Sequence, residues 1–135
     1  MPWELIRHQD AGIIETRYIG MMPISEVSDA MHGTIEFGLK NSALFYLGDL
    51  SRLEGGHSMA DLYAKARYLE TLDLPAGICE ALVLPESPDI RIFVEFWQTI
   101  CQRFGFNFHT VNSRDEGIAW LLQQKQVDQA SVLDH

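Results

Sequence analysis

The chain has 135 residues, and 47% of them are hydrophobic, which is enough apolar material for the core of one domain. Its formal net charge of −9, from 19 acidic against 10 basic residues, opposes binding to nucleic acid and to anionic membranes. No segment approaches the ~20 apolar residues of a membrane span, and no signal-peptide pattern is visible, so we expect one cytoplasmic domain over residues 1–135.

The first segments predict an antiparallel pair of strands followed by a helix. Residues 3–8 and 13–18 read as short strands, and the Asp-Ala-Gly sequence of residues 10–12 offers the turn that a hairpin needs. We expect Gly33 and Gly38 to weaken the helix that follows. Its inner face is predicted from apolar residues at three- and four-residue steps: Ile24, Val27, Met31 and Ile35.

The middle of the chain predicts a buried strand, a loop and a capped helix. Residues 42–47 are a short apolar run of the kind found in strands covered on both faces. Residues 48–57 are polar and contain two consecutive glycines, which indicates a loop. Ser58 and Asp61 then have the spacing of a capping box, in which a hydroxyl and a carboxylate satisfy two unpaired N–H groups.

The second half predicts two further strands, each followed by a helix. Residues 78–84 and 106–111 are the strands. Ser87 caps a helix that has Pro88 at its first position and ends before Gly105. A last helix begins after Ser113, and the polar residues 123–135 are expected to form a frayed tail.

Strands that alternate with helices predict parallel pairing with right-handed crossovers. We therefore expect an α/β fold in which one mixed, mostly parallel sheet of about five strands packs with about four helices. Cys79 and Cys101 lack the close spacing of metal ligands and read as buried thiols. The glycines form no phosphate-binding loop. No metal and no cofactor are expected.

Two stretches carry a resemblance to a known family. Residues 45–51 (Phe-Tyr-Leu-Gly-Asp-Leu-Ser) precede His57 and Ser58 at a helix start, and residues 115–121 (Asp-Glu-Gly-Ile-Ala-Trp-Leu) follow the last strand. With the order of elements, this resembles the STAS superfamily of anti-sigma-factor antagonists and sulfate transporter domains. Such domains have an Asp-Leu-Ser-like strand end, an Asp-Ser-Ser-Gly-like helix start and a pattern similar to Glu-Ala-x-x-Trp-Leu near the C-terminus.

The resemblance implies a non-enzymatic, regulatory module that binds a protein partner. Its binding or phosphorylation site would comprise Ser58, His57, Asp49 and Ser51, since family members bind partners around the motif serine, which a partner kinase phosphorylates. A phosphate at a helix N-terminus is favoured by the helix dipole. His57 stands where the family has an acidic residue, and the two residues after Ser58 also depart from its motif. Ser58 as a simple helix cap is the alternative.

Other functions stay open. The sequence Gly-His-Ser-Met-Ala at residues 56–60 is similar to a hydrolase nucleophile elbow, and Asp89 and His109 follow in the order of a catalytic triad. A small apolar ligand between helix and sheet is a further possibility. If Ile92 and Phe96 fall outside the buried stripe of their helix, they offer a surface for a partner or for a homodimer.

Overall fold

The computed structural model describes residues 3–8 and 12–133 and confirms the predicted α/β class and the order of elements. Asp10 and Ala11 of the predicted turn, and the last two residues of the predicted tail, lie outside the described residues. The elements are β1 (Trp3–His8), β2 (Ile13–Met21), α1 (Ile24–Lys40), β3 (Phe45–Gly55), α2 (Met59–Thr71), β4 (Cys79–Val83), α3 (Pro88–Arg103), β5 (Asn107–Val111) and α4 (Arg114–Leu133).

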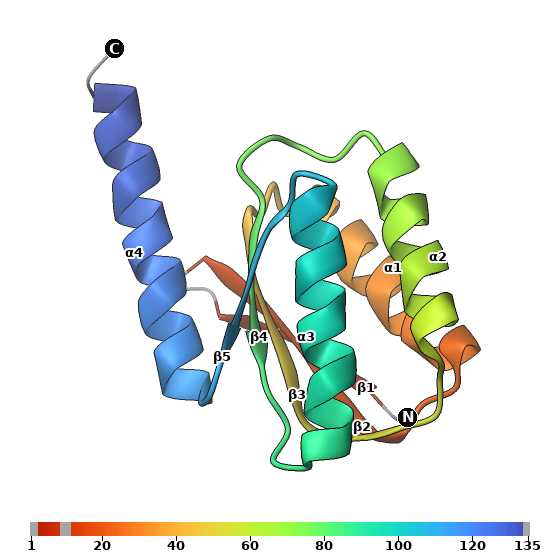
Figure 1. Ribbon diagram of the computed structural model, residues 1–135. Coiled ribbons are helices and arrows are strands. Elements are labelled where there is room, and N and C mark those ends of the chain that lie inside the picture. The colour runs from red at the N-terminus through yellow and green to blue at the C-terminus, as the bar shows by residue number, and fades with distance from the viewer. Residues whose placement is uncertain (1–2, 9–11, 134–135) are drawn as a thin grey trace.

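The strands form one five-stranded sheet in the order β1-β2-β3-β4-β5. β1 runs antiparallel to β2, and the other neighbours are parallel. Each of the three connections between parallel strands leads to the next strand on the same side, from β2 to β3, to β4 and to β5. Right-handed crossovers therefore place α1, α2 and α3 on one face of the sheet. α4 follows the last strand and lies on the opposite face (Figure 1).

A hydrophobic cluster fills the space on each side of the sheet. The larger cluster lies between the sheet and the layer of three helices, and it includes Leu82 and Trp97. The smaller cluster lies under α4 and includes Leu47, Ala81 and Leu121. Successive residues of β4 therefore face different helices, as expected for a strand that is covered on both faces.

β3 differs from the prediction. The predicted loop over residues 48–57 is wrong for most of its length, because β3 begins at Phe45 and continues to Gly55. Beyond Asp49 the strand pairs with β2 alone, and register shifts place extra residues of β3 opposite β2. Leu50 and Leu53 are both buried although they are three residues apart, so the two-residue alternation that identifies a strand is lost. Only residues 56–58 connect β3 to α2.

The end of the chain also differs from the prediction. A frayed tail was expected from Gln123, but α4 is helical from Arg114 to Leu133. Glutamine, lysine and alanine have good helix propensity, so they extend a helix that is already anchored at its start. The anchor is the first half of α4, where Ile118, Trp120 and Leu121 pack under the sheet.

Gly33 and Gly38 do not interrupt α1. A Cβ atom on Gly33 would lie 2.9 Å from the Trp3 ring, and one on Gly38 would overlap the Tyr46 hydroxyl. Both glycines therefore let α1 lie close to the sheet, and their cost in helix propensity is offset by this approach.

Replacing Gly38 with alanine is expected to destabilise the protein by about 1–3 kcal/mol, the range for overpacking in a core, because the Tyr46 ring has to move. Urea unfolding followed by circular dichroism measures the change. Glu36→Ala, at an exposed position of the same helix, is the control and should change stability by less than about 0.5 kcal/mol. Equal stability of Gly38→Ala and the unmodified protein would contradict the close contact.

Candidate functional site

The connector from β3 to α2 is held tightly against the end of β2. Gly55 and Gly56 both have positive φ angles, +114° and +111°, that other residues rarely adopt. The backbone N–H of Met22 donates to the carbonyl of Gly55 at 2.7 Å. A Cβ atom on Gly56 would lie 2.7 Å from the Met22 backbone, so this close approach requires glycine. The connector is therefore a short turn fixed by backbone contacts.

Ser58 caps α2 as predicted. Its hydroxyl accepts a hydrogen bond from the backbone N–H of Asp61 at 3.1 Å, and the Asp61 carboxylate accepts one from the backbone N–H of Ser58 at 2.9 Å. These bonds to Ser58 lower the pKa of the Asp61 carboxyl. Ser58 itself is exposed, so its hydroxyl is accessible from solvent while it caps the helix.

His57 joins the connector to two neighbouring elements. Its Nδ1 atom lies 3.0 Å from the carbonyl oxygen of Met22, and because a carbonyl only accepts, Nδ1–H is the donor. Its ring meets the Phe93 ring of α3 edge to face, with centroids 6.0 Å apart. The side chain therefore points inward, away from the exposed hydroxyl of Ser58, and helps to position the start of α2.

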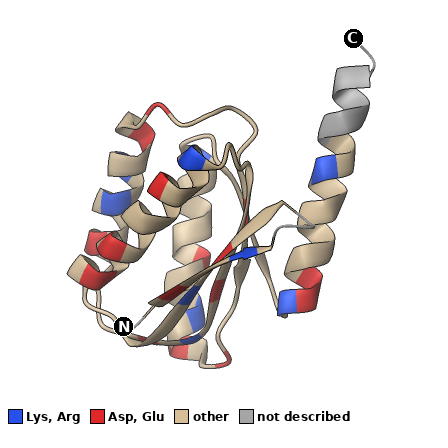
Figure 2. Ribbon diagram, turned by 180° about the vertical axis from the view of Figure 1, so that it is seen from behind, with Lys and Arg blue, Asp and Glu red and all other residues tan. Residues whose placement is uncertain are grey.

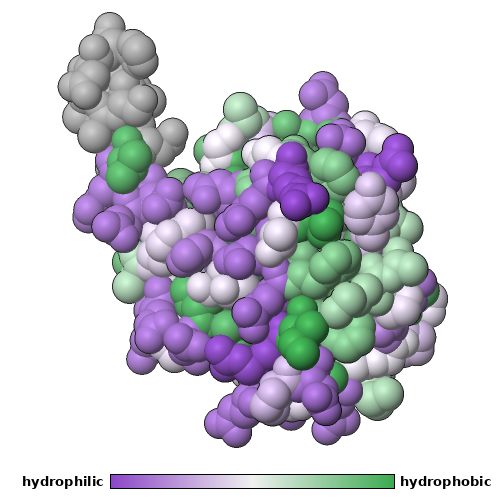
Figure 3. Space-filling model, in the orientation of Figure 1, coloured by the Kyte–Doolittle hydropathy of each residue, from purple (hydrophilic) through white to green (hydrophobic). Residues whose placement is uncertain are grey.

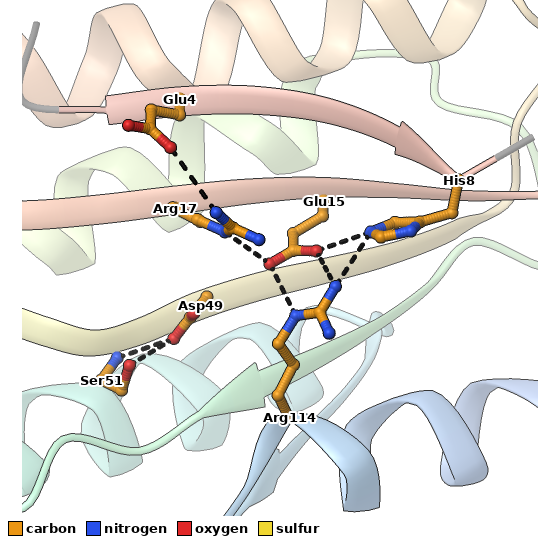
Figure 4. Close-up of polar contacts among 7 residues, drawn as sticks. All are labelled: Glu4, His8, Glu15, Arg17, Asp49, Ser51 and Arg114. Carbon is orange, nitrogen blue, oxygen red and sulfur yellow. Dashed lines mark hydrogen bonds and ion pairs between the residues drawn. The ribbon is translucent and has the colours of Figure 1, made fainter.

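Asp49 and Ser51 form a separate pair on β3. The Asp49 carboxylate accepts hydrogen bonds from the backbone N–H of Ser51 at 3.0 Å and from its hydroxyl at 2.6 Å (Figure 4). Asp49 also raises the pKa of Arg114, after the larger contribution of Glu15. The four predicted site residues are therefore arranged as two pairs, one beside α4 and one at the start of α2.

The residues of the hydrolase alternative do not meet. β3 does run nearly into the Gly-His-Ser motif, as an elbow requires. His109, however, lies on β5 with its ring stacked on Trp120 of α4, 5.2 Å between centroids, on the other side of the sheet from α2. Asp89 lies in the first turn of α3. Within residues 3–8 and 12–133, no histidine hydrogen-bonds to the Ser58 hydroxyl.

A buried charge network that the sequence analysis missed surrounds Glu15 of β2 (Figure 4). The Glu15 side chain has no exposed surface. Its carboxylate accepts hydrogen bonds from Arg114 at 2.6 and 3.0 Å and from Arg17 at 3.0 Å, and His8 Nε2 lies 2.6 Å away. Burial alone would raise the pKa of Glu15, but these partners outweigh it and lower the pKa to about 2. The network ties the β1–β2 hairpin to the start of α4, where Figure 2 shows acidic and basic residues together.

A second missed feature is an apolar cavity of about 110 Å³ between the sheet and the helices α1, α2 and α3. Its floor includes Tyr18, Leu82 and Glu80 from the sheet. Burial raises the pKa of the Glu80 carboxyl to about 7. A single glutamate inside the apolar run of residues 78–84 was the sequence signal that could have pointed to this site.

No group of three or more metal-ligating side chains occurs in the described part of the chain. The helices in that part also include none that is long and apolar enough to cross a bilayer. Cys79 and Cys101 are buried, as the sequence suggested.

Comparisons with known proteins identify the fold. No protein-family model matches the chain, and no curated protein matches it. Among solved structures, it is similar to the crystal structure of an uncharacterized protein of the DUF3478 family from Shewanella loihica, which has a SpoIIAA-like fold. The two chains are 12% identical, the match covers 88% of this chain and 91% of that chain, and the TM-score is 0.54. With its five-stranded mixed sheet and four helices, this chain therefore has a SpoIIAA-like, or STAS-like, α/β fold.

Proposed function

We propose that this chain is a non-enzymatic STAS-like module that binds a protein partner with the surface around Ser58. The observation that carries the proposal is an exposed serine at the start of a helix, presented by a connector that backbone contacts hold in place. A preorganised surface loses little conformational entropy when a partner binds, so such a connector suits recognition.

Apolar side chains near the connector support the same proposal. Met21 at the end of β2 is exposed and pairs with Gly55, just before the connector, and the exposed Met59 at the start of α2 follows the connector. Ile92 on α3 is exposed as well, whereas Phe96 is partly buried against the core. Figure 3 shows hydrophobic residues gathered over α2 and α3, while the surface over α4 is mainly hydrophilic. Exposed apolar patches of this kind commonly bind other proteins.

Phosphorylation of Ser58 would be the regulatory step. The free N–H groups at the start of α2 favour an anion there. A phosphate would also repel the Asp61 carboxylate, which now accepts the hydrogen bond from the Ser58 backbone at 2.9 Å. The modification would therefore change both the charge and the capping geometry of the surface that the partner contacts.

The proposal is tested by measuring partner capture from native lysate with Ser58→Ala and Ser58→Asp. We expect Ser58→Asp to reduce capture at least about fivefold, because a fixed negative charge alters the contact surface. Ser113 is the matched control, since its hydroxyl also accepts a hydrogen bond from a backbone N–H at a helix start, at 3.1 Å, but on α4. Replacement of a capping serine by alanine costs about 1 kcal/mol at either site, and aspartate is itself a good helix cap, so stability alone cannot explain a difference.

Capture that is unchanged in both Ser58 variants would remove the serine from the binding surface. A second copy of this chain is the alternative partner, and light scattering of the purified protein distinguishes a homodimer from a monomer that captures a different protein. Labelling of Ser58 by a fluorophosphonate probe would instead support a hydrolase.

A further inference from the structure

The cavity between the sheet and the helices is walled almost entirely by apolar side chains. α1 contributes Met31 and Ile35, α2 contributes Leu62 and Leu69, and α3 contributes Trp97, among others. The exposed residue Leu39 also lines the cavity, so it reaches the surface near the end of α1. A cavity of about 110 Å³ is somewhat smaller than the ~150 Å³ cavity that holds benzene, and it suits an apolar group of about five non-hydrogen atoms.

The titratable residues that line the cavity are Glu80, Tyr18, Tyr46 and His57, and His57 donates from Nδ1 to the carbonyl of Met22 at 3.0 Å. The carboxyl and hydroxyl groups of the lining fall into two sets. Thr34 donates to the carbonyl of Ala30, and Tyr46 donates to that of Ala43, so both hydroxyls are satisfied within the protein. The Glu80 carboxyl has no hydrogen bond or ion pair to any residue that the structure describes, and neither has the Tyr18 hydroxyl. No fully buried side-chain nitrogen or oxygen of the described residues lacks a partner, and the Glu80 side chain is only partly buried, so both groups keep some accessible surface, and both line the cavity. A carboxyl in such apolar surroundings suits a ligand that supplies hydrogen-bond donors.

Gly48 of β3 makes room for the Glu80 carboxyl. A Cβ atom on Gly48 would lie 3.4 Å from Glu80 Oε2 and 3.3 Å from Leu82 Cδ2, closer than most such contacts. Glycine in a central strand lowers the stability of that strand, so we explain Gly48 by the space that its missing side chain leaves for the Glu80 carboxyl. The carboxyl lies on the face of the sheet that carries Leu82 and Phe108, and it is held over the cavity floor.

We propose that this cavity binds a small aliphatic amine, with the alkyl chain among the apolar walls and the ammonium group paired with the Glu80 carboxylate. The lining includes no lysine or arginine, and its histidine, His57, already donates from Nδ1 to the Met22 carbonyl, so an anionic ligand such as a fatty acid would meet the Glu80 carboxylate without a permanent cation to pair with. An ammonium group supplies the hydrogen-bond donors that the carboxylate lacks, and a charge-assisted bond is stronger than one to a neutral hydroxyl. The net charge of −9 also favours the approach of a cation.

The test uses three probes of one size on the full chain: n-butylamine, 1-butanol and butyrate. Binding is followed by chemical-shift changes of backbone amides at residues 80–82 during titration. At pH 8 we expect millimolar binding of butylamine, about tenfold weaker binding of butanol and no binding of butyrate. Amine binding should weaken by about tenfold between pH 8 and pH 5.5, because burial gives Glu80 a pKa of about 7 and the carboxyl becomes neutral.

The variant Glu80→Gln removes the charge and keeps the shape. It should bind butylamine no better than butanol. Glu86→Gln is the matched control, since it makes the same change of net charge at an exposed position outside the cavity, and it should keep the amine preference. Equal binding of amine and alcohol by the unmodified chain, or an amine preference that survives in Glu80→Gln, would overturn the proposal. The comparison of the three probes on the unmodified chain tests the amine site even if the variant fails to fold. This test does not depend on the role of Ser58.

Discussion

Replacing Glu15 with glutamine should destabilise the protein by about 3 kcal/mol at pH 7, since removal of one partner from a buried ion pair leaves charges without compensation. Glu15 is fully buried and accepts hydrogen bonds from Arg114 and Arg17, whose side chains are 37% and 34% exposed. Because the two arginines can still reach water, the loss should lie at the lower end of the range for buried pairs. Urea unfolding of the variant and the unmodified protein measures it.

Glu4→Gln is the matched control for this experiment. Glu4 lies on β1 with 54% of its side chain exposed, and its carboxylate is 3.7 Å from Arg17. Removal of such an exposed charge should cost less than about 1 kcal/mol. Similar losses for Glu4→Gln and Glu15→Gln would show that the buried network has no special role in stability.

The stabilisation by Glu15 has a defined pH dependence. The pKa of this carboxyl falls from 4.5 to about 2 on folding, so its contribution is present above pH 4.5 and is lost as the pH falls toward 2. Between these values the unmodified protein should lose stability more steeply than Glu15→Gln. Equal slopes would contradict a carboxylate that stays ionised in the folded state.

Replacing Glu80 with glutamine should have the opposite effect and stabilise the protein at pH 8. Burial raises the pKa of Glu80 from 4.5 to about 7, so the folded state holds its proton more tightly than the unfolded state. Stability therefore falls as the pH rises from 4.5 to 7, by about 3 kcal/mol in all, since one pKa unit corresponds to about 1.4 kcal/mol. The neutral amide removes this loss.

The gain in Glu80→Gln should thus be about 3 kcal/mol at pH 8 and near zero at pH 4. Thermal unfolding across this pH range measures it. Glu86→Gln, at an exposed position, should show no such dependence. A Glu80→Gln variant that is less stable than the unmodified protein at pH 8 would contradict a carboxylate that has no partner in the cavity. A residue that lowers stability at neutral pH is the kind expected at a binding site.

Much of the fold could be predicted because pattern and chemistry agree along most of the chain. The capping box at Ser58 combines a hydroxyl and a carboxylate at a fixed spacing, and the structure confirms both bonds. The second half of β3 could not be predicted, because its register shifts put Leu50 and Leu53 out of alternation. This segment is a strand because it pairs with β2, and the local sequence pattern gives no information about that pairing.

The candidate sites were less accessible to prediction than the fold. Glu15 meets Arg114 across 99 positions of sequence, and such a contact exists only once the chain is folded. Glu80 is a single acidic residue in an apolar strand, and a strand pattern does not show whether the facing helices leave a cavity. The four residues chosen by resemblance are near in sequence, yet the long β3 strand separates Asp49 and Ser51 from His57 and Ser58.

The position of α2 has a consequence for the shape of the cavity. This helix packs chiefly on α3, for example through Tyr63 and Phe104 with ring centroids 6.2 Å apart, and makes few contacts with the strands. Displacing it would break a seam between two helices and leave every strand pairing intact. Because Leu62 and Leu69 of this helix also line the cavity, a change in the packing of α2 on α3 would alter the shape of the cavity while the strands keep their pairing.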